Sequence, residues 1–194
     1  MFYLECLKDA CELHHVSCYA YVLMTNHTHL LLGPTKEDGV SKVMKSLGRR
    51  YVQYINKHNQ RTGTLWEGRH KSSLVDVENY LLCCYRYIEL NPVMANMVEH
   101  PGDYRWSSYR SNAYGEDNKL IKQHDVYLSL SQDKQNRLNT YRALFNTVLP
   151  KKVIHDIRNA ANFSMPIGNS KFKDQIARTL NRSIGQAKRG RPVG

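Results

Sequence analysis

The chain has 194 residues, of which 41% are hydrophobic and 10% aromatic, and this composition excludes a wholly disordered protein. No apolar run approaches the roughly 20 residues that a membrane span needs, and no signal peptide opens the sequence, so we expect a cytoplasmic protein without a membrane partner. The five cysteines are odd in number and lack C-x-x-C spacing, which argues against a disulfide framework or a zinc knuckle.

Positive charge is concentrated in the second part of the chain, although the whole chain has a formal net charge of +11. Residues 1–115 hold 13 Lys and Arg against 11 Asp and Glu, a net of +2, whereas residues 116–194 hold 15 against 6, a net of +9. Such a distribution favours a polyanionic partner, of which nucleic acid is the natural one. A well-solvated basic tail is the alternative on charge alone.

The first third of the chain changes from helical to strand periodicity and back. Apolar side chains recur at helical spacing over residues 2–14 and predict an amphipathic helix. Residues 17–24 alternate as a strand, a turn follows, and residues 27–32 form the returning strand of a hairpin. A second amphipathic helix is predicted over residues 40–58. One face of the first strand is predicted to carry Tyr19, Tyr21 and Leu23.

The middle of the chain is predicted to contain a further strand and a third helix. Residues 65–75 have a strand pattern interrupted at Gly68, and Asp76 is placed to cap a helix that runs to about Leu90. Pro92 either stops that helix or begins a short new one. The sequence therefore predicts an α+β fold, an antiparallel sheet with helices packed on it.

Beyond residue 115 the pattern is helical. We predict two parts, an α+β domain over residues 1–115 and a basic helical extension over residues 116–194 that ends in a basic tail from residue 186. The helices predicted in the extension cover residues 124–149, 151–162 and 170–182.

Two histidines, His27 and His29, stand one residue apart in the returning strand. Alternate residues of a strand share a face, so both imidazoles project the same way from Cα atoms roughly 7 Å apart. Two such rings can hold one divalent metal ion. An ordinary pair of surface or core histidines is the alternative, and the pattern alone favours it.

Tyr87 and Asn91 lie four residues apart on the predicted third helix, and this spacing stacks them on one helix face. A tyrosine oxygen can attack a phosphodiester and keep the DNA end as a phosphotyrosine, and an Asn carbonyl beside it can complete a metal shell. The chain has 13 tyrosines, most of them packing residues. Because Tyr80 and Tyr85 lie on the same helix, periodicity alone does not select Tyr87.

Four blocks together carry a specific signal: YAYVLMTNHTHLLL at residues 19–32, TLWEGRHK at 64–71, YIELNPVMANMV at 87–98 and PGDYRWSSY at 101–109. Their order and spacing closely resemble those of REP-associated tyrosine transposases, which are single-tyrosine HUH transposases related to the small insertion-sequence enzymes. The resemblance covers residues 1–115, and the ending KRGRP at 188–192 fits the family more loosely.

The resemblance implies a role for each matched residue. Tyr87 matches the nucleophile, His27 and His29 match two metal ligands, and Asn91 matches a third, polar ligand of Mg²⁺ or Mn²⁺. It implies a transposase that cleaves and rejoins single-stranded or hairpin DNA of repetitive palindromes through a 5′-phosphotyrosine. Residues 1–115 are then expected to be an HUH catalytic domain, a ferredoxin-like sandwich that lacks its N-terminal strand and so exposes a sheet edge.

Basic side chains and a second subunit complete the expected interactions. Arginines and lysines along the chain could contact DNA phosphates, with surface solvation as the alternative for each. Moving a DNA segment requires two ends, which favours a homodimer, although this branch of the family also includes monomers. The expected DNA-binding residues are Arg49, Arg50, Arg69, Lys71, Lys188, Arg189 and Arg191.

Two other functions fit the same residues. The first is a catalytically inactive, host-recruited protein that binds DNA sequence-specifically; the missing strand favours it, and the intact set of His27, His29, Tyr87 and Asn91 opposes it. The second is a metal-dependent phosphoesterase that acts through water, with Tyr87 in a structural role. Only the transposase forms a covalent protein–DNA adduct.

Overall fold

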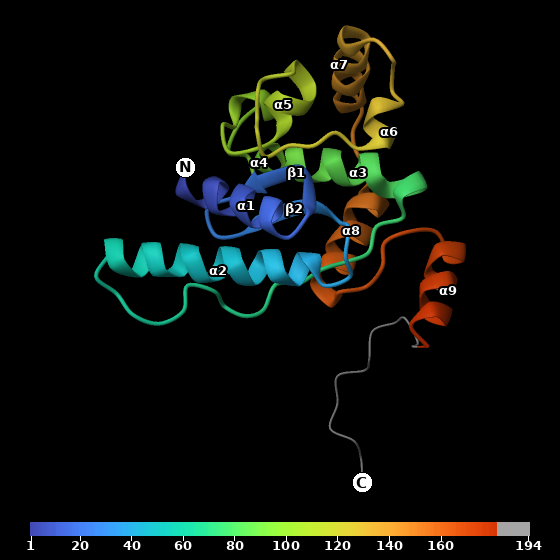
Figure 1. Cartoon of the computed structure of the whole chain (residues 1–194). Helices are drawn as coiled ribbons and strands as arrows, with labels where there is room; N and C mark the ends of the chain where they lie inside the picture. Colours follow the sequence, from blue (N-terminus) through green and yellow to red (C-terminus); the bar gives the residue numbers. More distant parts are fainter. Residues whose placement is uncertain (182–194) are drawn as a thin grey trace. The chain divides into compact units, whose positions relative to one another are not determined.

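A computed structural model of the chain describes residues 1–181 and has the predicted α+β class, with helices packed on a small antiparallel sheet (Figure 1). The contacts group into two compact units. One contains residues 1–70 and 84–148, and the other contains residues 71–83 together with those from 149 onward. The domain boundary expected after residue 115 stays a prediction.

The first unit begins with the helix and hairpin that the sequence predicts. Helix α1 (Phe2–Leu13) is followed by β1 (Val16–Leu23) and β2 (Thr28–Pro34), which pair antiparallel. Met24 N donates to His27 O at 2.8 Å and closes the hairpin. His27 therefore lies in the turn, one residue before the strand in which it was predicted.

The side-chain alternation of β1 differs from the prediction because its register with β2 shifts between Cys18 and Ala20. An extra residue at such an irregularity reverses the faces that follow it. Tyr21 and Leu23 lie on one face, as predicted. Cys18 of β1 lies in the core on that face, in place of the predicted Tyr19.

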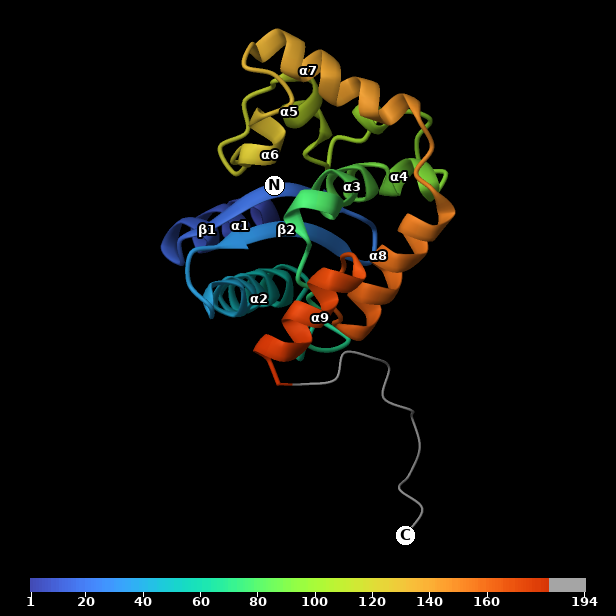
Figure 2. The same cartoon turned by 90° about the vertical axis from the view of Figure 1, so that its right-hand side faces the viewer.

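Helix α2 (Gly39–His58) packs with α1 on one face of the hairpin, and Figure 2 shows α2 and α3 on opposite sides of the strands. The helix is amphipathic, as predicted, and Val43 and Leu47 on its apolar face are fully buried. The core on this face consists of Tyr3, Cys6, Leu7, Ala10, Cys11, Val16, Cys18, Tyr21, Val43, Leu47 and Leu120.

The free edge of β1 is covered by chain from later in the sequence. Leu23 N donates to Trp106 O at 2.9 Å, Ser108 N to Tyr21 O at 3.0 Å, and Lys122 N to Cys18 O at 2.8 Å. These bonds satisfy backbone groups that an edge strand would otherwise leave open. Within the described part of the chain, β2 pairs only with β1.

The third helix, α3 (Val77–Glu89), begins after Asp76 as predicted, and its last six residues belong to the first unit. A short new helix, α4 (Asn91–Met94), carries Pro92 near its N-terminus, where the missing N–H of proline is tolerated. The 3₁₀ turn η1 (Pro101–Asp103) and helix α5 (Tyr109–Tyr114) follow; neither was predicted.

The single helix predicted over residues 124–149 is wrong. The chain forms α6 (Asp125–Leu128), α7 (Lys134–Ala143) and the 3₁₀ turn η2 (Leu144–Asn146). The interruption has a local cause, because Asp133 Oδ1 accepts from Asn136 N at 2.8 Å and so caps a new helix.

The second unit contains α8 (Lys151–Phe163) and α9 (Ser170–Thr179), close to the predicted ranges. The strand predicted over residues 65–75 is wrong, since only Val75 forms a bridge, with Ile167. A strand needs a neighbour to satisfy its backbone, and residues 66–72 are exposed without one in the described structure. None of the helices within residues 1–181 is long and apolar enough to cross a membrane.

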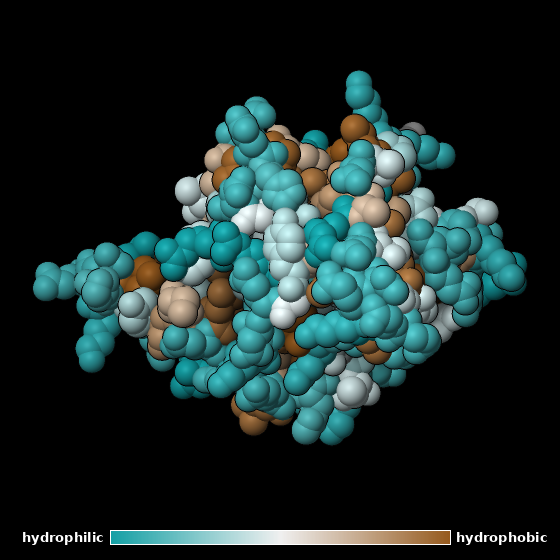
Figure 3. Space-filling view, turned by 90° about the horizontal axis from the view of Figure 1, so that it is seen from above, coloured by the Kyte–Doolittle hydropathy of each residue, from teal (hydrophilic) through white to brown (hydrophobic). Residues whose placement is uncertain are grey.

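The space-filling view in Figure 3 shows a mostly hydrophilic face with small, separated apolar groups. This agrees with the scattered positions of the exposed large apolar side chains, among them Leu13, which is 69% exposed, and Val148, which is 90% exposed. Single exposed apolar residues of this kind are ordinary on a protein surface.

The buried core under α2 yields the first prediction. We expect Leu47→Ala to lower the free energy of unfolding by about 2–5 kcal/mol, because Leu47 is 1% exposed and its removal leaves a cavity. The matched control is Leu13→Ala on α1, which should change it by less than about 0.5 kcal/mol because that side chain lies in solvent. Urea unfolding of both variants measures the difference, and equal effects would contradict the assignment of this core.

Candidate active site

The rings of His27, His29 and Tyr87 meet beside the hairpin turn. The imidazole centroids of His27 and His29 are 5.0 Å apart, with planes at 82°. The centroid of His29 lies 5.5 Å from that of Tyr87. The structure therefore brings these three predicted residues together: two come from the hairpin, and the third comes from a helix that lies far from the hairpin in the sequence.

The strand register explains why His29 faces α3. His29 pairs with Val22, which is fully buried yet lies outside the core formed with α1 and α2. Thr28 points to the opposite face, where the Tyr3 hydroxyl lies 3.3 Å from its Oγ1. Because faces alternate along a strand, Thr28 fixes the direction of His29.

The His27 ring is exposed, and its neighbour determines which nitrogen can bind a metal ion. Its Nδ1 lies 2.7 Å from Asn26 Oδ1. Because an amide oxygen only accepts, a hydrogen bond here requires the tautomer with its proton on Nδ1, which leaves the lone pair on Nε2. A hydrogen bond of this kind, from the nitrogen that does not bind the metal to an oxygen acceptor, is usual for metal-binding histidines.

Tyr87 and Asn91 lie on one side of the α3–α4 junction and are both largely buried, at 5% and 8% exposure. Asn91 Nδ2 donates to Tyr87 O at 2.7 Å, which leaves the amide Oδ1 as the acceptor. Imidazole nitrogens with an amide oxygen suit Mn²⁺, whereas Mg²⁺ would take its remaining ligands from water or phosphate oxygens. Among residues 1–181 no cluster of three His, Cys, Asp or Glu side chains is arranged to hold a metal ion.

Sequence reasoning missed Glu89, the last residue of α3, which is completely buried. Ser108 Oγ donates to Glu89 Oε1 at 2.6 Å, and Asn112 Nδ2 donates to the same oxygen at 2.8 Å. The Tyr141 hydroxyl donates to Oε2 at 2.6 Å. One signal could have found this residue: an acidic side chain in the apolar stretch from Leu81 to Pro92 must be hydrogen-bonded if that stretch is buried.

Burial raises the pKa of Glu89 to about 7, although its hydrogen bonds from Ser108, Tyr141 and Asn112 act in the opposite direction. The carboxyl group is therefore closer to neutral than an exposed glutamate at the same pH.

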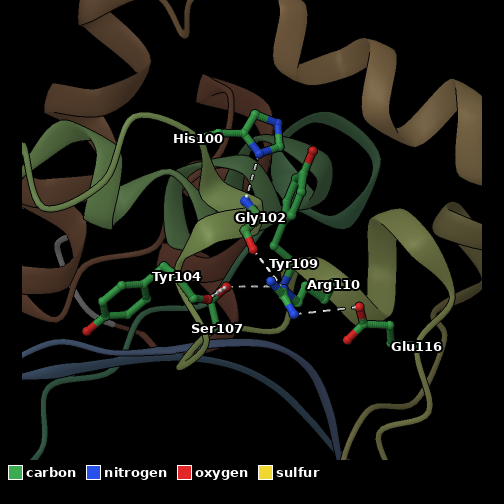
Figure 4. A network of polar contacts seen from close by, with 7 residues as sticks. All are labelled: His100, Gly102, Tyr104, Ser107, Tyr109, Arg110 and Glu116. Atoms are coloured by element: carbon green, nitrogen blue, oxygen red, sulfur yellow. Dashed lines mark hydrogen bonds and ion pairs between the residues drawn. The ribbon is translucent and has the colours of Figure 1, made fainter.

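The segment that supplies Ser108 is held by its own polar contacts (Figure 4). His100 Nδ1 accepts from Gly102 N at 3.0 Å, and Arg110 Nε donates to Gly102 O at 2.7 Å. Tyr109 N donates to Ser107 Oγ at 3.3 Å. These bonds fix the turn that delivers Ser108 to Glu89.

Tyr85, an alternative nucleophile on α3, is a core residue. It is fully buried, and its ring lies 6.3 Å from that of Tyr127 and 6.1 Å from that of Tyr141. Burial raises the pKa of Tyr85 far above its ordinary value, and the Glu89 charge raises it further. Tyr80 belongs to the second unit.

The predicted DNA-binding residues are dispersed. Arg49 and Arg50 lie on α2, the helix across the sheet from His29, and Arg50 Nη1 pairs with Asp9 Oδ2 at 2.9 Å. Arg69 and Lys71 are exposed, the second in the other unit. The remaining three, Lys188, Arg189 and Arg191, lie outside the described residues.

Residues 2–91 match a family model of transposases, and the match contains His27, His29, Tyr87 and Asn91. The model is described as "Transposase IS200 like", so residues 2–91 are similar to the IS200-like transposases. This similarity supports a transposase function and implies DNA binding. Comparison with curated proteins and with solved structures gave no match.

The raised pKa of Glu89 predicts a pH-dependent stability. Between pH 4.5 and about 7 the folded state keeps the proton that the unfolded state loses, so the free energy of unfolding falls as the pH rises. Glu89→Gln has no such group. We expect the wild-type protein to lose stability relative to Glu89→Gln by up to about 1.4 kcal/mol per pH unit across this window.

Urea unfolding of both proteins from pH 4 to pH 8, without metal ions, measures the difference. Other titrating groups cancel in the comparison. Parallel pH profiles would show that Glu89 keeps an ordinary pKa in the folded state.

Proposed function

We propose that this transposase domain cleaves and rejoins single-stranded DNA through a covalent link to Tyr87. The observation that carries the proposal is the meeting of His27, His29 and Tyr87, with ring centroids 5.0 and 5.5 Å apart, inside a match to the IS200-like family. The proposal also follows the resemblance to REP-associated tyrosine transposases, whose substrates are DNA hairpins.

In the proposed reaction the Tyr87 oxygen attacks the phosphorus of a phosphodiester. The bond between phosphorus and the 3′ oxygen breaks, a new bond joins phosphorus to Tyr87, and the leaving oxygen takes a proton to become a 3′-hydroxyl. Attack by the 3′-hydroxyl of another DNA end reverses these steps and releases Tyr87. One phosphodiester replaces another, so no nucleotide triphosphate is consumed.

His27 and His29 would hold the divalent metal ion, and Asn91 Oδ1 is the third candidate ligand. A bound Mg²⁺ or Mn²⁺ would supply charge stabilisation at the phosphate. Asn26 would keep His27 in the tautomer whose Nε2 can bind the ion. Tyr87 is 5% exposed and its ring lies 5.5 Å from that of His29, so α3 would hold it in a fixed orientation for the attack.

Tyr87→Phe tests the nucleophile. With Mn²⁺ or Mg²⁺ and a labelled hairpin oligonucleotide with single-stranded flanks, the parent should form an adduct that survives denaturation and disappears after nuclease digestion. Tyr87→Phe should abolish the adduct and leave DNA affinity nearly unchanged, because the substitution removes one oxygen. Denaturing gel electrophoresis and fluorescence anisotropy measure the two quantities.

Tyr80→Phe and Tyr85→Phe are the matched controls, since both residues lie on α3 without an Asn four positions later. Both variants should retain the adduct. Cleavage without any adduct in the parent would indicate the water-dependent phosphoesterase, and binding without cleavage would indicate the inactive DNA-binding protein. An adduct that persists in Tyr87→Phe would identify another nucleophile.

Asn26→Ala tests the metal site by removing the side chain that orients His27. Loss of the carbonyl that orients His27 should raise the metal concentration for half-maximal adduct formation by roughly 10- to 100-fold. Saturating Mn²⁺ should restore the rate. His29→Ala should lose the adduct at every metal concentration, since a ligand itself is gone. An unchanged metal requirement in Asn26→Ala would remove His27 from the proposed site.

The proposed partners are hairpin DNA and a second copy of the chain. Joining two DNA ends can be done by two active sites, one in each copy of the chain. Sedimentation with and without hairpin DNA distinguishes a dimer from a monomer. Cytoplasmic localisation remains part of the proposal.

A further inference from the structure

Five aromatic rings form a continuous row on α2 and its neighbours. Tyr54 stacks between Phe2 and His58, with centroids 4.2 and 5.7 Å away and interplanar angles of 28° and 11°. Tyr51 lies 6.5 Å from Tyr54 and 6.2 Å from Trp66. We call these five residues the α2 aromatic stripe.

Phe2 and Tyr51 of the stripe are partly buried against the core, whereas its other three rings lie at the surface. Tyr54 is 40% exposed and Trp66 is 37% exposed, whereas the core positions of the same helix, Val43 and Leu47, are closed to solvent. His58, at the end of the stack, is also exposed. Large aromatic side chains that keep free surface are typical of binding sites.

The loop after α2 holds Trp66 against the helix. Trp66 N donates to Thr64 Oγ1 at 3.1 Å, and Asn56 Nδ2 donates to Gly63 O at 2.9 Å. The indole Nε1 lies 3.5 Å from the position that a Cβ would take at Gly48. The indole is therefore placed on the helix surface by local contacts.

Positive charge accompanies the rings. Arg50, Tyr54 and Lys57 are spaced by four and three residues on α2, which places the two cations on the helix face of Tyr54. Arg50 pairs with Asp9 at 2.9 Å, but these side chains are 44% and 46% exposed. Such a pair contributes little, so a phosphate can replace the carboxylate.

We propose that the exposed surface of the α2 aromatic stripe, at Tyr54, His58 and Trp66, contacts the unpaired bases of single-stranded DNA, while Arg50 and Lys57 contact its phosphates. Every base has a π face, so the surface would hold a strand of any sequence. A duplex hides those faces. The stripe lies across the sheet from His29, so it would bind a part of the strand away from the reacting phosphate. The identity of the ligand rests on the proposed function.

The test uses the full chain with Tyr87→Phe as the parent, so that no DNA is cleaved. Two fluorescent strands of equal length, oligo-dT and an abasic strand, carry the same phosphates and differ only in bases. We expect Tyr54→Ala to weaken binding of oligo-dT by roughly 5- to 100-fold and to leave the abasic strand unaffected. Tyr54→Phe should retain the parent affinity, because the ring remains.

Two variants control for charge and for exposed tyrosines in general. Tyr114→Ala on α5 removes a tyrosine that is 45% exposed, like Tyr54, and should change neither affinity. Lys57→Gln should weaken both strands equally and lower the slope of log affinity against log salt by about 0.7. Thermal unfolding confirms that each variant is folded.

Equal binding of oligo-dT by the parent and Tyr54→Ala would overturn the proposal, and so would an equal loss for both strands. If the stripe packs against a second copy instead, sedimentation will show self-association that Tyr54→Ala removes while the preference for oligo-dT over the abasic strand persists. The adduct assay with Tyr87 intact tests the proposed reaction separately. A negative result for the stripe therefore does not contradict the proposed function, and the reverse also holds.

Discussion

The carboxylate of Glu89 determines how helix α3, which carries Tyr87, is oriented. It is completely buried and receives hydrogen bonds from Ser108, Asn112 and Tyr141, and each would lose a partner if α3 rotated. Residues two apart on a helix point roughly 200° from one another. Anchoring Glu89 on one side of α3 therefore directs Tyr87 to the other side, toward His29.

These hydrogen bonds to Glu89 make the position of α3 depend on residues that lie later in the chain. Asn112 on α5 donates to Glu89 and also to Tyr19 O on β1, at 3.2 Å, and its own carbonyl accepts from the Tyr127 hydroxyl at 2.7 Å. Tyr141 on α7 completes the set. The family match ends at residue 91, yet α3 within it is held by side chains that lie beyond it. Residues 109–143 thus serve as a support for the site, whatever else they bind.

What could be predicted from the sequence was local. Period two in β2 was sufficient to place His29 on the face opposite Thr28, but periodicity did not select Tyr87 from Tyr80 and Tyr85. The expectation that His29 and Tyr87 meet needed the family resemblance as well, and their chemical roles stay predictions. The strand expected over residues 65–75 failed because a strand depends on a partner that its own residues do not reveal. Glu89 was missed because its donors lie 19 to 52 residues away, and no periodicity connects Glu89 to Tyr141.

The hairpin register is the second constraint, and it acts on both faces of the sheet at once. In the observed register His29 turns toward Tyr87, while Thr28 meets Tyr3 and Leu30 packs on the core beneath α1 and α2. A slip by one residue would exchange these faces, burying an imidazole among apolar side chains and sending Leu30 to the tyrosine. The apolar core under the helices therefore excludes that slip, since it would leave a polar ring without partners. Packing of the hairpin against α1 and α2 thus fixes the register in which His29 faces Tyr87.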